Sequence, residues 1–141
     1  MRSHSDNNVD SPAAVVRSVF TRVFAGDVAP FATNPGLASL DKVFPGMLRA
    51  FPDFRAELKQ QMVDGNRVAS QWIFRGTHLG EFHGVPPTGK SVEFQNISIC
   101  EVVEGRIVAY NSEIGALRLL MQIGALPFGA AKAGAEPALA R

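Results

Sequence analysis

The sequence predicts an α+β fold in which a mostly antiparallel sheet packs against helices from the first part of the chain. Apolar residues recur at helical spacing up to about residue 51, and from residue 54 they alternate with polar residues as in strands. Glycine-containing turns join these strands into a meander. Helices followed by consecutive strands are typical of α+β proteins rather than of βαβ proteins.

The first expected helix begins after Ser11, a good N-cap residue, and Pro12 suits its first helical position. Its apolar face is made of valine and phenylalanine side chains: Val15, Val16, Val19, Phe20, Val23 and Phe24. A second helix is expected from Ser39 to about Phe51. Pro45-Gly46 lies inside it and should kink or split it.

The strands follow from alternation and turn signals. The first begins near Phe54 and would place Ala56, Leu58, Gln60 and Met62 on one face, before the hairpin signal Asp64-Gly65. The other expected elements are strands over residues 68–77, 91–103 and 106–114 and a short apolar helix over 117–123, which Gly124 ends.

The 141-residue chain has the size of one domain, and its composition excludes several function classes. Lys+Arg 14 against Asp+Glu 13 gives a net charge of +1, without the basic stripe typical of proteins that bind nucleic acids or anionic membranes. No apolar run approaches the ~20 residues of a membrane span, and the polar N-terminus is unlike a secretory signal. The single cysteine, Cys100, cannot form an internal disulfide, so we expect a cytoplasmic protein.

We expect the folded domain to cover residues 11–126. Residues 1–10 are polar, and residues 127–141 carry small side chains without helical periodicity, so a disordered lead and a flexible tail are expected there. Three histidines and one cysteine are barely enough for a structural zinc site and are wrongly spaced. We therefore expect no metal and no cofactor.

The third expected strand carries the most informative pattern. Its even-numbered face is apolar at both ends and polar in the middle: Val92, Phe94, Asn96, Ser98, Cys100 and Val102. A solid core would place large aliphatic side chains at mid-strand, because voids are costly. Small polar groups there favour a lined pocket. The alternative is that Asn96 and Ser98 bond each other or a buried water molecule.

The turn before the fourth strand decides which of its residues share that face. We expect a three-residue loop over 103–105, with Gly105 in the left-handed region as a bulge, because such a loop needs glycine in third place. This loop pairs even positions with even positions, and the expected pairs are Tyr110 with Ser98 and Ser112 with Asn96. A two-residue turn would bring Asn111 and Glu113 to the same face instead.

The chain also resembles a known family over about residues 51–126. Six motifs carry the resemblance in order and spacing: Phe51-Pro-Asp-Phe54, Asp64-Gly-Asn-Arg-Val68, Gly76-Thr-His-Leu-Gly-Glu81, Gly84-Val-Pro-Pro-Thr-Gly89, Val103-Glu-Gly-Arg-Ile107 and Gln122-Ile-Gly124. On these motifs the sequence resembles the SnoaL-like polyketide cyclases of the nuclear-transport-factor-2-like superfamily. The resemblance implies a cone-shaped fold, with a curved sheet around a pocket and helices closing the other side. It also implies a homodimer packed through the outer sheet face, where Ile97 and Ile99 would contribute.

The resemblance further implies which positions would carry chemistry. In the aldol-type cyclases of this family, an Asp on the last strand is the general acid/base, and a His and an amide residue on the preceding strand assist it. Here the Asp position is Ser112, the His position is Ser98 and the amide position is Asn96. A serine cannot take up a proton at neutral pH as a carboxylate or an imidazole can. Only Asn96 remains as the polar helper.

We therefore expect a small-molecule cyclase or isomerase of secondary metabolism that closes a ring in an apolar, polyketide-like substrate, mainly by binding and orienting it. Proximity and orientation supply about 7–11 kcal/mol in favourable cases, and hydroxyl or amide donors polarise a carbonyl. The candidate catalytic residues are Asn96, Tyr110, Ser112 and Glu113. The candidate substrate-binding residues are Ser98, Trp72, Phe94 and Cys100.

Two other functions stay open. An acid–base cyclase, or an epoxide or ester hydrolase, would use Glu113 or another carboxylate such as Asp41 in place of the missing Asp. A non-catalytic protein would bind the same small molecule without converting it. His78, Glu81 and His83 fall in the loop before the third strand, where their spacing matches no metal-binding helix, and His78 is expected to brace that loop.

Overall fold

The structure, a computed structural model, describes residues 11–126; the expected lead and tail lie outside the described residues. Its α-helices are α2 (Pro12–Phe24), α3 (Ala38–Ala50) and α4 (Ala116–Gln122), and two short 3₁₀ helices, η1 (Ala29–Ala32) and η2 (Pro35–Leu37), join α2 to α3. The strands are β1 (Arg55–Asp64), β2 (Arg67–Thr77), β3 (Ser91–Val103) and β4 (Arg106–Ile114). They pair antiparallel in chain order. The predicted α+β fold is confirmed.

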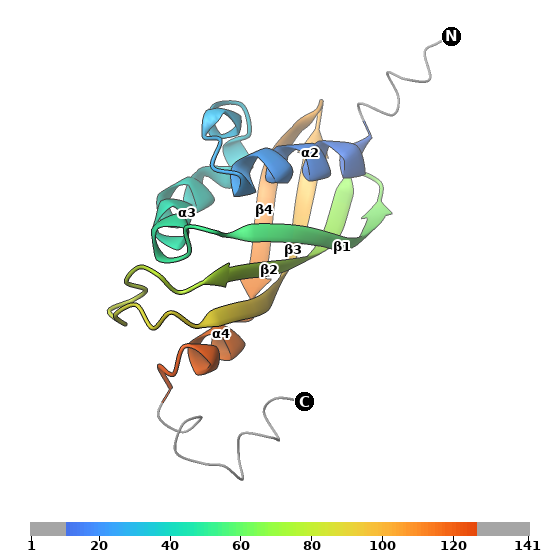
Figure 1. Cartoon of the computed structure of the whole chain (residues 1–141). Coiled ribbons are helices and arrows are strands. Elements are labelled where there is room, and N and C mark those ends of the chain that lie inside the picture. Colours follow the sequence, from blue (N-terminus) through green and yellow to red (C-terminus); the bar gives the residue numbers. More distant parts are fainter. Residues whose placement is uncertain (1–10, 127–141) are drawn as a thin grey trace.

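The sheet is curved and unclosed, and α2 lies across its inner face with α3 beside it (Figure 1). α4 lies at the opposite end, against the first residues of β3, where β4 no longer pairs (Figure 1). There the Gln122 side chain replaces a strand, because it accepts from the backbone N of Glu93 at 2.7 Å and donates to the Glu93 carbonyl at 2.8 Å. Within residues 11–126, no helix combines the length and apolar character needed to cross a membrane.

The first helix begins and packs as its sequence predicts. The Ser11 hydroxyl caps it by accepting a hydrogen bond from the backbone N of Ala14 at 3.2 Å. Five apolar side chains of the helix are buried against the sheet: Val15, Val16, Phe20, Val23 and Phe24.

The second helix departs from the prediction at its proline. We expected a kink or a split at Pro45-Gly46; α3 runs without a break from Ala38 to Ala50 with Pro45 inside it, so the split does not occur. Pro45 removes one backbone donor from the helix, and its side chain is exposed. The opposite face of the helix is held by buried Phe44 and Ala50, whose packing outweighs the local cost of the proline.

A bulge in β1 corrects the expected face pattern of that strand. The pairing with β2 shifts between Leu58 and Gln60, so that Lys59 is an extra residue. Beyond the bulge the inward position belongs to Gln61, whose amide donates to the Ser70 hydroxyl at 3.3 Å. Met62, expected on the same face as Ala56, is 64% exposed.

The β3–β4 turn also differs from the expectation. It is a two-residue turn in which both Glu104 (φ 51°) and Gly105 (φ 76°) are left-handed, the conformation that a type I′ hairpin requires. The bulge comes later, where Val102 pairs with Ile107 but Glu101 pairs with Ala109, leaving Val108 extra. Even positions of β3 therefore pair with even positions of β4, as predicted. The cause is a two-residue turn followed by a bulge at Val108, and not the predicted three-residue loop.

This difference in the turn and the bulge changes which residues of β3 and β4 are paired. Tyr110 lies opposite Cys100 and Ser112 lies opposite Ser98, whereas Asn96 faces Ile114. The predicted pairs were wrong by two residues, because the bulge lies within β4 rather than at the turn.

The segment around η2 fixes this bulge. The Asn34 side chain is buried, donates to the Pro30 carbonyl at 2.8 Å and accepts from the backbone N of Ile107 at 2.8 Å. Gly36 packs so closely on the strand that a Cβ there would lie 2.6 Å from the backbone N of Ala109. This contact covers the edge of β4 and holds the residues around Val108 in the bulged form.

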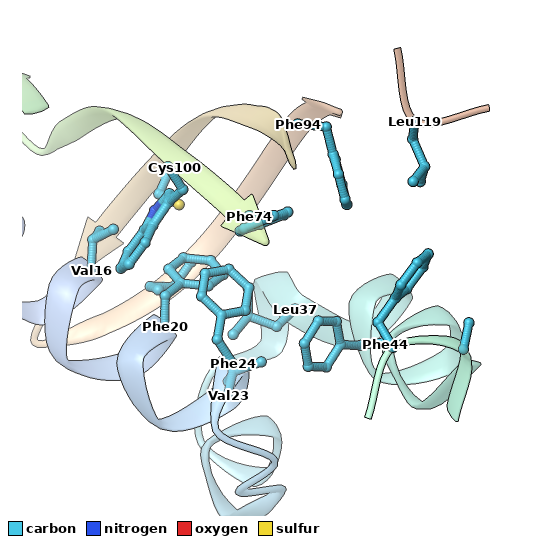
Figure 2. Packing of buried hydrophobic residues seen from close by; sticks show 14 of the residues in the cluster. Val16, Phe20, Val23, Phe24, Leu37, Phe44, Phe74, Phe94, Cys100 and Leu119 are labelled. Atoms are coloured by element: carbon cyan, nitrogen blue, oxygen red, sulfur yellow. The ribbon is translucent and has the colours of Figure 1, made fainter. Parts of the chain in front are cut away.

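The core lies between α2, α3 and the inner sheet face, and aromatic rings pack against one another at its centre (Figure 2). The Phe24 ring is 5.1 Å from Trp72 and 5.0 Å from Phe74, both in edge-to-face contact. Figure 2 shows Phe20, Phe24 and Phe44 leading from α2 toward α3, with Cys100 and Val16 at the other end of the cluster. Phe24, Phe44 and Phe74 of this aromatic cluster also line a cavity.

Candidate functional site

A cavity of about 750 Å³ opens between α3, the β2–β3 loop and the inner face of β3 and β4. Its volume falls within the usual range of small-molecule sites. Most of its wall is apolar, and the apolar lining residues are Phe24, Leu40, Val43, Phe44, Met47, Phe74, Phe82 and Ile114. The remaining lining residues are polar, charged or glycine.

Three of the predicted catalytic residues meet in this cavity. Asn96 from β3 and Tyr110 and Ser112 from β4 all line it. Asn96 is 3% exposed, while Tyr110 and Ser112 are half-buried. They lie on one face because the Val108 bulge restores even-to-even pairing between the two strands. The arrangement brings an amide and two hydroxyls, all hydrogen-bond donors, to one apolar wall.

The surroundings of Tyr110 keep its phenol protonated. Burial raises the pKa of Tyr110 above its ordinary value of 10.0, and the neighbouring Ser112 and Asn96 side chains lower it less. Tyr110 also packs against Phe20, with ring centroids 5.4 Å apart. The phenol is a neutral hydrogen-bond donor at physiological pH.

The four predicted substrate-binding residues do not line this cavity but lie in the core beside it. Trp72, Phe94, Ser98 and Cys100 are each no more than 3% exposed. The Trp72 Nε1 and Ser98 Oγ atoms are buried without a hydrogen-bond partner. Burial raises the pKa of the Cys100 thiol to about 12, so it is not a thiolate nucleophile near neutral pH.

The two carboxylates considered from the sequence lie away from the cavity. Glu113 is opposite Ile97 on the outer face of the sheet and is exposed, as strand alternation requires. Asp41 is exposed in the first turn of α3 and does not line the cavity.

Three charged or titratable residues that the sequence reasoning did not assign to a site do line the cavity: Arg49, Glu81 and His83. All three are exposed, so they mark its mouth, whereas Asn96 and the phenylalanines form its inner wall. Phe82 and Val85 exchange two backbone hydrogen bonds around His83 (φ 49°) and Gly84 (φ 81°), a tight two-residue turn. The His83-Gly84 pair is the sequence signal that could have placed this turn.

The loop that carries Glu81 and His83 is tied to the end of α3. Backbone N–H groups of Leu79 and Gly80 both donate to the Ala50 carbonyl at 3.0 Å. Gly80 is required at this approach, since a Cβ on it would clash with the Arg49 carbonyl. The mouth is thus built on two segments in direct backbone contact.

His78 lies at the base of the same loop, as predicted. Its ring is fully buried, and its Nδ1 accepts from the backbone N of Thr88 at 3.2 Å. Backbone bonds from His78 N to the Lys90 carbonyl and from Gly89 N to the His78 carbonyl close the loop. Within residues 11–126, no group of three or more His, Cys, Asp or Glu residues is arranged to hold a metal ion.

Comparisons with known proteins identify the family and the fold. Residues 7–123 match the family model of the SnoaL-like polyketide cyclases. The structure is similar to AclR of Streptomyces galilaeus, a candidate hydroxylase, with 29% identity and a TM-score of 0.74 over 82% of this chain and 97% of that one. It is also similar to IdmH of Streptomyces antibioticus, a candidate polyketide cyclase, with 28% identity and a TM-score of 0.67 over 80% and 98% of the two chains.

A SnoaL-like protein from Jannaschia sp. CCS1 shares the fold at 18% identity, with a TM-score of 0.72 over 90% of this chain and 99% of that one. No curated protein sequence matches the chain.

Proposed function

The chain belongs to the SnoaL-like polyketide cyclase family and has its nuclear-transport-factor-2-like fold, and we propose that it closes a ring in an apolar, polyketide-like molecule. Both the family and its similar structures support a cyclase-type role. The proposed enzyme works mainly by binding its substrate in a reactive shape, as a cycloaddition or a conjugate addition requires.

The observation that carries this proposal is the convergence of Asn96, Tyr110 and Ser112 on the apolar cavity. A flexible chain buried there is held with its reacting ends close together and oriented, which lowers the barrier to ring closure. The inner wall offers donors to a carbonyl oxygen but neither a carboxylate nor an imidazole. These donors would stabilise negative charge that develops on the oxygen during ring closure.

The test compares the products formed by cells that make this protein with those of cells that lack it. A cycloaddition, a conjugate addition or an aldol addition gives a product with the mass of its substrate, an aldol closure followed by dehydration loses one water, and a hydrolysis gains one. Mass spectrometry of the molecule that accumulates in the absence of the protein therefore separates ring closure without loss of atoms from dehydration and from hydrolysis. Conversion of that molecule by the purified protein, with unchanged mass, is the expected result.

A triple variant tests the three donors. Replacing Asn96 by Leu, Tyr110 by Phe and Ser112 by Ala should abolish conversion, while circular dichroism shows an intact fold. Glu113→Gln is the matched control and should convert at the normal rate, because Glu113 lies on the outer face. An unchanged rate in the triple variant would contradict the proposal. Binding of the accumulated molecule without conversion by the natural chain would favour a non-catalytic binding protein.

One observation favours a second candidate function, acid–base cyclisation or hydrolysis. Glu81 and His83 line the mouth of the cavity. A substrate that extends from the inner wall to the mouth would therefore meet a carboxylate and an imidazole. Glu81→Gln should then reduce the rate by about 10²–10⁴-fold. A Glu81→Gln variant with a normal rate would exclude this function.

A further inference from the structure

We propose that Arg49 forms an anion-binding subsite at the mouth of the cavity, so that the preferred ligand is a free carboxylic acid with an apolar body. This inference rests on the proposed function, because it takes the cavity as the substrate site. It adds a charged end to the substrate.

The Arg49 guanidinium lies at the cavity. Arg49 and Gly46 both line the cavity, and they are one helical turn apart on α3, so they share a face of the helix. The Arg49 Nη2 atom lies 3.7 Å from the position that a Cβ on Gly46 would occupy. The guanidinium therefore lies back along the helix at the cavity rather than extending away from it.

Arg49 forms no ion pair with any residue between 11 and 126. Among the described residues, the ion pairs within 4.0 Å involve Arg22, Lys59, Arg55 and Arg75, and Arg49 takes part in none of them. Glu81 lines the same mouth but is not within that distance of Arg49. An arginine has a fork of N–H donors that matches a carboxylate in a bidentate pair, so its unpaired fork is free for a ligand.

The charges at the mouth also orient the ligand. A carboxylate is attracted to Arg49 on α3 and repelled by Glu81 on the β2–β3 loop, while the His83 ring adds a further nitrogen donor. The apolar body of the ligand then extends over Phe44 and Phe74 toward the inner wall. A carbonyl group in that body meets the donors Asn96, Tyr110 and Ser112, so the substrate is held at both ends.

Binding of a matched pair of probes tests the subsite. Anthracene-9-carboxylate and its methyl ester share one fluorescent apolar body and differ in charge, and their dissociation constants are measured by fluorescence titration at fixed low salt. Arg49→Gln should weaken binding of the acid about tenfold and leave binding of the ester unchanged. Arg49→Lys, which keeps the charge but loses the fork, should lie between the natural chain and Arg49→Gln.

Arg17→Gln is the matched control, because Arg17 is exposed on the outward face of α2 and does not line the cavity. It should change neither dissociation constant. If the natural chain binds the ester but Arg49→Gln does not alter the preference between acid and ester, the Arg49 subsite is refuted. The cavity would still be a binding site for apolar ligands, as the proposed function requires. If the natural chain binds neither probe, the ligand cavity of the proposed function fails together with the subsite.

Discussion

The side chain of Asn34, which comes before the sheet in sequence, holds the last strand in place through Ile107. Its Oδ1 accepts from the backbone N of Ile107 at 2.8 Å, on the edge of β4 that no other strand pairs. The bulge at Val108 is the next residue along the chain. Because of this bulge, Tyr110 and Ser112 face the cavity. A residue that does not line the site thus fixes the geometry of the site.

Removing this acceptor should destabilise the protein. Asn34→Ala leaves the amide of Ile107 buried without a partner, and we expect the free energy of unfolding to fall by about 1–3 kcal/mol in urea titrations. Asn66→Ala is the control, because the Asn66 amide bonds Glu101 at an exposed position, and its effect should stay within about 0.5 kcal/mol. Equal losses in the two variants would show that the Asn34 bond has no special role.

Gly36→Ala tests the close approach of η2 to β4. The added Cβ would lie 2.6 Å from the backbone N of Ala109, so one of the two segments must move. We expect a loss of about 1–3 kcal/mol in unfolding free energy, together with weaker binding of the anthracene methyl ester. Gly115→Ala, whose Cβ would meet nothing closer than 3.6 Å, should retain ester binding. Normal ester binding in Gly36→Ala would contradict the link between this contact and the cavity.

The titration of Tyr110 can be observed directly, since it is the only tyrosine of the chain. Burial raises its pKa above 10.0, so near-ultraviolet absorbance should show the phenolate at higher pH in the folded protein than in urea. The folded state then holds this proton more tightly than the unfolded state. Its contribution to stability is complete below pH 10 and is lost as pH rises through the folded pKa. A phenolate transition at the same pH in both states would contradict the buried position.

Cys100 should resist thiol reagents while the protein is folded. The thiol is fully buried and its pKa is raised to about 12, so it lacks both access and thiolate character. A chromogenic disulfide reagent at pH 8 should label it at least about a hundredfold more slowly in buffer than in urea. Because Cys100 is the only cysteine, the signal needs no correction. Rapid labelling of the native protein would place the thiol at an accessible surface.

The outer sheet face is the surface through which we propose that two copies pair. Ile99 is 53% exposed and Ile97 is 39% exposed there, so association would bury apolar area that solvent now contacts. Ile99→Lys should shift the sedimenting species from dimer to monomer. Val28→Lys is the control at another exposed apolar residue, which lies in the loop after α2 and is 68% exposed. A natural chain that sediments as a monomer at all concentrations would exclude this dimer.

Much of this fold could be predicted from sequence, because its elements follow local rules. Alternation and glycine turns set the bounds of β3 and β4, and a serine–proline pair set the start of α2. The predictions for α3 and for the faces of β1 were wrong in part, because tertiary packing there outweighs local sequence preferences. Pro45 is tolerated because the buried face of α3 holds the helix, and a bulge at Lys59 moved Gln61 to the inner face.

The candidate site divides in the same way. Asn96, Tyr110 and Ser112 could be predicted from the sequence because even and odd positions of a strand point to opposite faces of the sheet. Once even positions of β3 are assumed to pair with even positions of β4, these three side chains share one face. Trp72, Phe94, Ser98 and Cys100 share that parity but lie in packed core. The alternation of a strand shows which way a side chain points, but the helices above it decide whether the space there is filled.

By itself the sequence determined the order of the helices and strands and the polar centre of β3. The tertiary structure alone decided that Arg49 and the Glu81–His83 turn meet at one mouth, and that the bulge of β4 lies at Val108. The physical reason is distance along the chain. Arg49 and His83 belong to segments that meet through the Ala50 carbonyl, and Asn34 reaches a strand more than seventy residues later. No local spacing encodes such contacts, because they arise only when the whole core has packed.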